Sequence, residues 1–338
     1  MMNVQKCNGV YVFVEMLDGV VSGVAFELLG KGKDLAEARD TDVTAVVLGA
    51  CGAEIYASLA GYGADHIVAI DHPILATYRT EAYTSALHQM VVDRKPEIML
   101  FGATAIGRDL APRLSARLRT GLTADCTGLE IDEVSGNLLM TRPAFGGNLM
   151  ATILCAEHRP QMATVRPGVM QRRAFAASAV ADVAHLQVDL PPDCDNVEIL
   201  ETVTHPTTKM GIHEAKVLVS GGRGMGGPEN FAQLEDLAGL LGGTVASSRA
   251  AVDAGWIEKV RQVGQTGQTV RPDLYIACGI SGAVQHLVGM EESGLIIAIN
   301  KDASAPIFSV ASLGIVGDWK IVLPALNKAL QAELSDAR

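Results

Sequence analysis

The chain has 338 residues, of which 49% are hydrophobic and 19% charged, and its formal net charge is −11. This composition excludes a disordered chain, and the acidic balance without a dense Lys/Arg cluster argues against a nucleic-acid binder. Glycine is frequent, at 35 residues, whereas aromatic residues make up only 4%. Many glycines and few aromatics favour an α/β protein with tight turns over a β-sandwich.

The six cysteines stand singly, and none has the spacing of a zinc site or of a Cys-x-x-Cys motif. We expect reduced core cysteines, as in a cytosolic protein, and no metal site. The first apolar run, residues 10–16, is too short and too alternating for a signal peptide or a membrane span. We therefore expect a cytoplasmic protein that does not insert into a membrane.

The first part of the chain alternates apolar strands with helical patterns. Ser22 is a possible N-cap of the first helix, and Pro96 ends the third helix. The alternation predicts a parallel, right-handed α/β layer. We expect strands at 9–15, 43–48, 66–70 and 98–101, and helices at 22–38, 53–60, 80–94 and 108–119.

The alternation of strands and helices stops after Leu122, where short strands are joined by turns rich in Gly, Asn and Pro. These strands form either an antiparallel extension of the sheet or a flap. The runs 142–148 and 164–168 are interpreted as structural turns, with a partner surface as the alternative. We expect the short strands at 127–131, 138–141, 150–155 and 161–166.

Residues 176–212 differ in composition and contain Leu190-Pro-Pro-Asp and His205-Pro. Such a stretch is typical of a crossing segment or linker. We place the domain boundary near Pro206, which gives an N-terminal α/β domain with a β-rich extension, 1–205, and a second domain, 206–338.

The second domain repeats the strand and helix alternation, and Pro228 suits the first turn of its first helix. Its pattern predicts a second α/β domain with a mainly parallel, Rossmann-like sheet. We expect strands at 216–220, 244–246, 273–277 and 295–299, extended chain at 307–316, and helices at 229–241, from 250 onward, at 282–290 and over 318–334.

The run Gly222–Gly227 matches Gly-x-Gly-x-x-Gly after a strand and before a helix. Glycines let backbone approach a phosphate, and a helix N-terminus favours its charge. An NAD site also expects an acidic residue about twenty residues later. The sequence there reads Ser247-Ser-Arg249, so NAD is disfavoured and Arg249 leaves NADP open. The alternative for Arg223 and Arg249 is a surface salt bridge.

Two further runs carry polar chemistry. In Cys278–His286 the glycines open a turn, Ser281 can cap the following helix, and a pyrophosphate would fit the helix amides. A lone histidine is more often structural, but His286 stands beside a Gly-Ser turn, so both interpretations stay open. Val263–Gln268 is either a solvated loop or a loop that wraps a polar ring with hydrogen bonds.

Taken together, these runs resemble the alpha subunit of an electron-transfer flavoprotein. The resemblance covers nearly all of the second domain and is looser in the first, where Asp125, Arg142-Pro143 and Arg166–Gly168 fit the family. The matching runs are 219–224, 229–231, 248–255, 263–267, 274–277, 279–282, 285–286, 299–302, 305–308 and 317–318.

The resemblance implies one FAD in the second domain. By motif, Arg223 and the 281–285 turn would face phosphates, and Ser248 and Arg249 would lie beside the isoalloxazine. Thr266 would lie near N5, and His286 near N1 and O2. The residues implied to bind FAD are Arg223, Ser248, Arg249, Val263, Gly264, Gln265, Thr266, Gly279, Ser281, Gly282, Ala283, Val284, Gln285, His286, Asn300 and Asp318, with Asn300 and Asp318 at the adenosine half.

The resemblance also implies a heterodimer with a beta subunit, which the first domain would contact. The pair would take electrons from dehydrogenases such as the acyl-CoA dehydrogenases of fatty acid oxidation and pass them on through a flavin semiquinone. A cation such as Arg249, or His286 as donor or cation, would stabilise negative charge at the flavin N1 and O2. No catalytic triad is recognisable.

Two alternatives remain. Within the family, the complex would bifurcate electrons from NADH with a second FAD held mainly by the beta subunit, which makes it part of an enzyme. Outside the family, the chain would be a nucleotide-binding regulatory module or an NADP-dependent oxidoreductase that uses Arg249.

Overall fold

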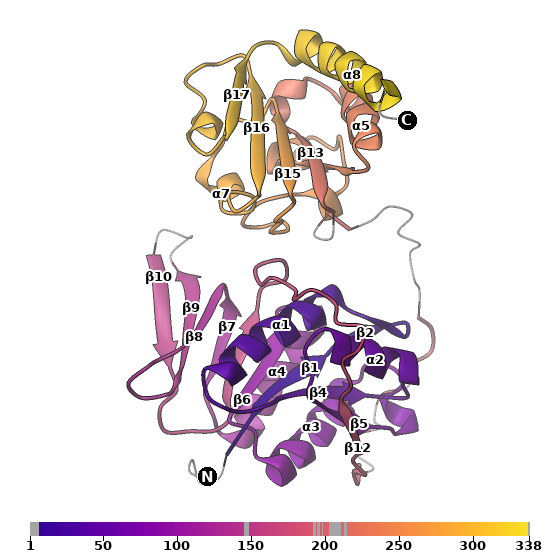
Figure 1. Cartoon of the computed structure of the whole chain (residues 1–338), viewed down its shortest axis with the longest axis vertical. Coiled ribbons are helices and arrows are strands. Elements are labelled where there is room, and N and C mark those ends of the chain that lie inside the picture. Colours follow the sequence, from indigo (N-terminus) through magenta and orange to yellow (C-terminus); the bar gives the residue numbers. More distant parts are fainter. Residues whose placement is uncertain are drawn as a thin grey trace. The chain divides into compact units, whose positions relative to one another are not determined.

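The computed structural model describes residues 7–144, 149–191, 194, 197, 199–202, 211–212 and 215–336. The chain divides into two compact units, Met1–Val203 and Thr204–Arg338 (Figure 1). The boundary expected near Pro206 lies outside the described residues. Within the described part, every helix is too short or too polar to span a bilayer.

The first unit is built on a seven-stranded sheet in the order β12-β5-β4-β1-β6-β11-β7, and all of its strand pairs are parallel. The expected parallel α/β layer is confirmed. Its strands are β1 (Val10–Val14), β4 (Val43–Leu48), β5 (His66–Ile70), β6 (Ile98–Gly102), β7 (Leu122–Cys126), β11 (Gln161–Val165) and β12 (Asp182–His185).

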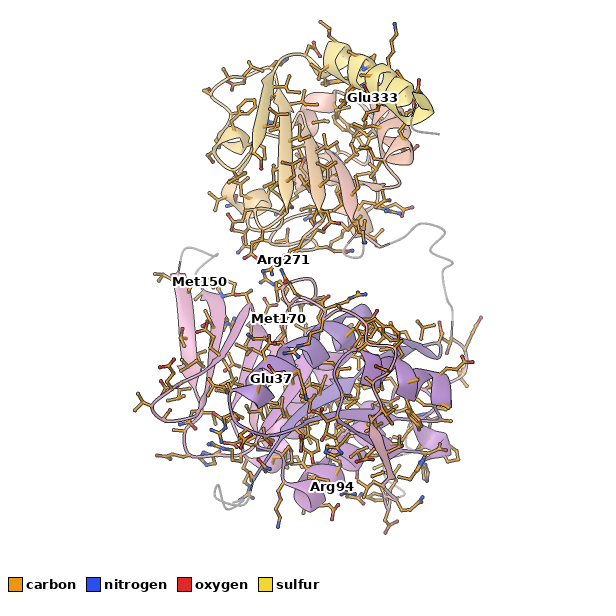
Figure 2. All side chains as sticks on the ribbon, viewed as in Figure 1. Glu37, Arg94, Met150, Met170, Arg271 and Glu333 are labelled. Atoms are coloured by element: carbon orange, nitrogen blue, oxygen red, sulfur yellow. The ribbon has the colours of Figure 1, made fainter. Side chains whose placement is uncertain are left out.

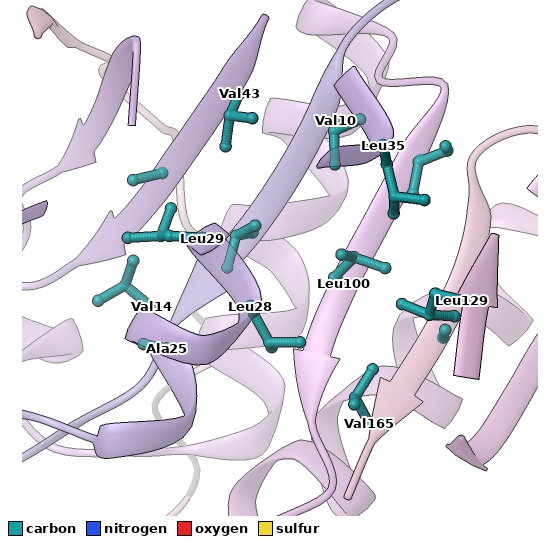
Figure 3. Packing of buried hydrophobic residues seen from close by; sticks show 14 of the residues in the cluster. Val10, Val14, Ala25, Leu28, Leu29, Leu35, Val43, Leu100, Leu129 and Val165 are labelled. Carbon is teal, nitrogen blue, oxygen red and sulfur yellow. The ribbon is translucent and has the colours of Figure 1, made fainter. Parts of the chain in front are cut away.

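Helices cover both faces of this sheet, because its central strands are apolar on both sides. Leu28 and Leu29 of α1 pack over one face, against strands that carry Val14, Val43 and Leu100 (Figure 3). The other face packs against α3 and α4. The helices are α1 (Gly23–Glu37), α2 (Ala53–Gly61), α3 (Thr80–Arg94) and α4 (Ala105–Leu118). Ser22 does precede α1, but its hydroxyl makes no capping hydrogen bond.

The β-rich segment forms a separate antiparallel sheet in the order β10-β9-β8. Its strands are β8 (Gly128–Ile131), β9 (Leu138–Ala144) and β10 (Leu149–Leu154). The strand expected at 161–166 does not belong to this extension, because β11 pairs in parallel with β6 and β7 in the main sheet. A two-stranded ribbon of β2 (Met16–Leu17) and β3 (Val20–Val21) was not predicted.

The second unit holds a five-stranded sheet in the order β14-β13-β15-β16-β17, again with parallel pairs throughout. The expected second α/β domain with a parallel sheet is therefore confirmed. The strands are β13 (Val217–Gly221), β14 (Thr244–Ser247), β15 (Leu274–Cys278), β16 (Leu295–Asn300) and β17 (Leu313–Val316).

The faces of this second sheet are covered differently. On one face α5 (Phe231–Leu240) and α8 (Trp319–Asp336) lie side by side and, with α6 (Arg249–Asp253), complete an apolar core (Figure 1). On the other face, loops and the short helix α7 (Val284–Leu287) pack against the sheet. This second face carries the long loops that the sequence singled out.

Three expectations for the second unit need correction. The helix expected at 282–290 is only the single turn α7. The segment expected to be extended from residue 307 begins with a 3₁₀ turn, Pro306–Ser309, before β17. Pro228 opens a 3₁₀ turn, Pro228–Asn230, which leads into α5 at Phe231.

Candidate functional site

The five parallel strands of the second unit end at one edge of the sheet, and the loops after them carry most of the predicted residues. Arg223 follows β13, Ser248 follows β14 and Asn300 ends β16. The loop Gly279–Ala283 follows β15 and leads into α7 (Figure 1). In open parallel sheets, ligands bind outside the carboxyl ends of the strands, where the strand order reverses. Here that point lies between β13 and β15.

At this point the two loops touch through glycines. A Cβ on Gly222 would come within 2.3 Å of the Gly279 carbonyl oxygen, and one on Gly224 within 2.8 Å of the same residue. Gly279 itself has a positive φ of 61°. The amide of Gly224 donates to the Gly279 oxygen at 3.0 Å. Two glycines of the Gly-x-Gly-x-x-Gly match therefore serve close packing between loops.

Backbone hydrogen bonds also join the loop Val263–Gly267 to its neighbours. The amide of Val263 donates to Ser247 at the end of β14 (2.9 Å), and the amide of Gln265 donates to the Gln285 oxygen in α7 (2.7 Å). A Cβ on Gly264 would come within 2.6 Å of that same Gln285 oxygen. This loop is therefore held between β14 and α7.

The other side of the edge is joined in the same way. The Asn300 side chain donates to the Ile280 oxygen (2.9 Å) and accepts from the Asp302 amide (3.0 Å). The Ile307 amide donates to the Ser281 oxygen (3.0 Å). The Trp319 indole, next to Asp318, donates to the Gly224 oxygen (2.9 Å). The Asn300 side chain thus fixes two loops, because its amide nitrogen binds the loop after β15 and its amide oxygen binds the loop after β16.

His286 is buried, with 6% of its surface exposed. Its Nδ1 lies 3.1 Å from the Val263 oxygen, and its Nε2 lies 3.0 Å from the Tyr275 hydroxyl. Burial lowers its pKa to about 4, although the bond to Val263 raises it, so the ring is neutral at neutral pH. The cationic form of His286 that the sequence left open is therefore disfavoured. Contact between His286 and flavin O2 stays a prediction. Because both ring nitrogens already have partners, this contact would require the ring to give up either Tyr275 or Val263.

Tyr275 was not singled out from the sequence. In the structure this residue has no exposed surface. Burial raises the pKa of its phenol, and the neighbouring Ser220 hydroxyl lowers it. Ser220 lies in β13, is fully buried and makes no hydrogen bond by ordinary geometry. In the sequence, Ser220 and Tyr275 stand out only as polar residues inside otherwise apolar strands. That pattern does not show that Tyr275 pairs with His286.

The turn after β15 offers unpaired donors. In the described part of the chain, the backbone N–H groups of residues 281–285 donate to no protein acceptor, and Ser281, Ala283, Val284 and Gln285 are exposed. Consecutive free amides form a concavity that binds anions. Ser281 is not the cap expected from the sequence, because α7 begins after Ala283 and has no side-chain cap.

The charged and polar side chains of the edge are exposed. Arg223, Arg249, Thr266 and Asp318 all face solvent. Arg249 forms an exposed pair with Asp253 (3.2 Å), and the Thr266 hydroxyl accepts from the buried Gln262 amide (3.0 Å). The Arg223 guanidinium and five free amides suit the two phosphates of a dinucleotide, so the residues present fit FAD.

The first-unit residues that the sequence noted lie elsewhere. Arg166 donates to both carboxylate oxygens of Asp125, at 3.1 and 2.6 Å. Burial raises the Asp125 pKa, but Arg166 and two further arginines lower it more, so the carboxyl stays ionised. Asp125 has a positive φ of 61° and lies in β7 where the register with β11 shifts, so this pair secures a strained position within the strand. Of the turn expected at 142–148, residues 142–144 instead belong to strand β9, and residues 145–148 lie outside the described residues.

Comparison with known proteins gives a consistent result. A family described as electron transfer flavoprotein domain matches residues 10–191, and one described as electron transfer flavoprotein FAD-binding domain matches residues 211–291. The electron transfer flavoprotein subunit alpha of Clostridium acetobutylicum is 52% identical, over 98% of this chain and 99% of the relative.

Two further relatives also match almost end to end. Protein FixB of Clostridium saccharobutylicum is 52% identical, over 96% of this chain and 97% of the relative. The acryloyl-CoA reductase electron transfer subunit beta of Anaerotignum propionicum is 42% identical, over 97% of each chain.

Proposed function

The chain belongs to the alpha subunits of electron transfer flavoproteins, and we propose that the loop edge of its second unit holds the FAD through which this family transfers electrons. When bound, the flavin supplies the redox chemistry. The observation that carries the assignment is the run of free amides at residues 281–285, where the strand order reverses and where the loop after β15 packs against the loop that carries the exposed Arg223.

Each part of the edge has a proposed role. The amides of 281–285 and the Arg223 guanidinium bind the phosphates, since both are donors in an acidic chain. Ser248, Arg249, Gln265 and Thr266 face the isoalloxazine. Asn300 and Asp318 flank the adenosine half, while Val263, Gly264, Gly279 and Gly282 supply the backbone geometry.

We further propose that the first unit binds the beta subunit through β10. This strand is the outer strand of its sheet, and its outer edge pairs with no described strand. Leu149, Met150, Ile153 and Leu154 are 40–58% exposed (Figure 2 labels Met150). The strand contains no charged residue, so nothing in it discourages pairing with another chain.

The electron donor is proposed to be a dehydrogenase of CoA thioesters, such as an acyl-CoA dehydrogenase. The support is that one relative is named as an electron transfer subunit of an acryloyl-CoA reductase. Transfer from NADH with bifurcation is the alternative, and the next experiment separates the two.

The test is to purify the chain with its beta subunit, record the absorbance spectrum, count flavins and titrate with NADH. One FAD that NADH leaves oxidised, but that an acyl-CoA dehydrogenase with its substrate reduces, is the expected result. Two FADs reduced by NADH identify a bifurcating complex. A complex without flavin contradicts the proposed function.

A further inference from the structure

Tyr275 places a hydroxyl group deep inside the apolar sheet of the second unit. Its neighbours in the register are Leu218 on β13 and Ile296 on β16, and the residue has no exposed surface. A buried hydroxyl is costly unless it is hydrogen-bonded. Its partner is His286 Nε2, at 3.0 Å, so the tyrosine joins the sheet to the histidine above it.

The second partner of the ring fixes the direction of both bonds. His286 Nδ1 faces the Val263 carbonyl oxygen at 3.1 Å, and a carbonyl can only accept a hydrogen bond. Nδ1 must therefore carry the proton. In a neutral imidazole Nε2 is then an acceptor, so the Tyr275 hydroxyl must be the donor. The Val263 oxygen thus selects the tautomer, and the Tyr275 hydroxyl donates to the Nε2 lone pair that this tautomer leaves buried.

Val263 begins the loop that carries Gln265 and Thr266. This loop is tied to α7 by the Gln265 amide, which donates to Gln285, and by the His286 ring. With the other neutral tautomer, the Nδ1 lone pair would face the Val263 oxygen and repel it. Loss of the Tyr275 donor would leave Nε2 buried without a partner, and would so weaken the attachment of the loop while leaving every residue of the loop unchanged.

We propose that Tyr275 is a positioning residue of the cofactor site: its hydroxyl pairs Nε2 of His286 in the tautomer that binds Val263, and His286 in turn holds the Val263–Gly267 loop. That this loop faces the flavin rests on the proposed function. The tautomer and the loop attachment rest only on the geometry of the chain itself, so the two parts can be tested separately.

The test compares Tyr275→Phe with Tyr83→Phe in the full chain bound to its beta subunit. Tyr83 is a matched control, because its buried hydroxyl donates to the Leu75 oxygen at 2.9 Å in the first unit. Imidazole ¹⁵N shifts report the tautomer, and hydrogen exchange of the Gln265 amide reports the loop. Y275F should keep this tautomer, move the Nε2 shift and speed the exchange about tenfold, the effect of one lost hydrogen bond; Y83F should change neither.

A double-mutant cycle separates positioning from general loss of packing. His286→Asn keeps a donor for Val263 but has no Nε2 for Tyr275 to pair with, so Y275F should not speed exchange further in that background. Unchanged shifts and exchange in Y275F, additive effects in the cycle, or the same loop response in Y83F would each overturn this positioning role of Tyr275.

The link to the cofactor has its own readout. Y275F should shift the midpoint potential of bound FAD although Tyr275 is buried beneath the site. A loosened loop with an unchanged potential would overturn the assignment of Tyr275 to the cofactor site and would leave the FAD function intact. A chain that binds no FAD but shows the faster loop exchange in Y275F would instead contradict the proposed function.

Discussion

His286 illustrates at the residue scale how burial decides which form of a side chain the fold uses. Its folded pKa of about 4 lies below its ordinary value of 6.5. The unfolded chain therefore binds an additional proton between these two pH values. The stability that comes from keeping the ring neutral is complete above pH 6.5 and is lost as the pH falls towards 4, by about 3 kcal/mol in all.

Tryptophan fluorescence can measure this loss selectively, because the chain has two tryptophans and both, Trp256 and Trp319, lie in the second unit. Urea unfolding should give a stability difference between wild type and His286→Asn that shrinks as the pH falls from 6.5 to 4. Both proteins contain the same carboxylates, so the pH dependence that these carboxylates contribute cancels in the stability difference. A difference independent of pH would mean that the ring is not held neutral.

Arg249 allows a second prediction at this scale. Its exposed pair with Asp253 contributes little to stability, whereas a guanidinium beside a flavin favours the reduced form by its charge. Arg249→Ala should lower the midpoint potential of bound FAD with almost no change in unfolding temperature.

The matched control for this prediction is Asp253→Ala, which removes the pair but keeps the cation. Asp253→Ala should leave the potential unchanged or raise it. An equal decrease in both variants would assign the effect to helix α6 itself and would argue against a direct role of the arginine charge.

At the scale of elements, burial determined what the sequence could predict. The buried apolar runs of β4 and β5 were predicted with correct ends, because such runs leave few alternatives. The exposed strand β12 was missed, since Asp182–His185 shows no apolar pattern. Helix α7 was predicted too long because the positive φ of Gly282 and its contact with the Ile307 backbone are not visible in the sequence.

The candidate site shows the same limit. The motif runs predicted loops that the parallel strands do bring to one edge of the sheet, while the contacts of these loops with FAD stay a prediction. The pairing of Tyr275 with His286 depends on a ring that reaches from α7 to a residue in the middle of β15. No local pattern encodes such a contact, because the packing of the loops over the sheet creates it.

The edge strand β10 supports a prediction about assembly. Ile153→Lys places a charge in the exposed apolar strand, so it should weaken binding of the beta subunit about tenfold or more, as loss of an interface anchor does. Calorimetric titration of the chain with the beta subunit measures this. Val134→Lys is the control, because Val134 is 96% exposed in the turn between β8 and β9. Equal binding by both variants would contradict docking at β10.

At the scale of the whole molecule, the described core clusters do not mix residues of the two units. Those of the first unit lie between Val10 and Cys194, and those of the second between Ile212 and Leu330. The loops proposed to bind FAD all belong to the second unit. Their geometry should therefore depend on the second core and hardly on the first.

Two matched cavities test this independence. Leu100 and Leu234 are both fully buried, in the first and second core respectively. Truncating a buried leucine to alanine costs about 2–5 kcal/mol. In the full chain, Leu234→Ala should lower the urea midpoint seen by tryptophan fluorescence, whereas Leu100→Ala should leave it unchanged and lower a separate calorimetric transition. If Leu100→Ala lowered the fluorescence midpoint equally, the units would unfold as one, and the flavin loops would depend on both cores.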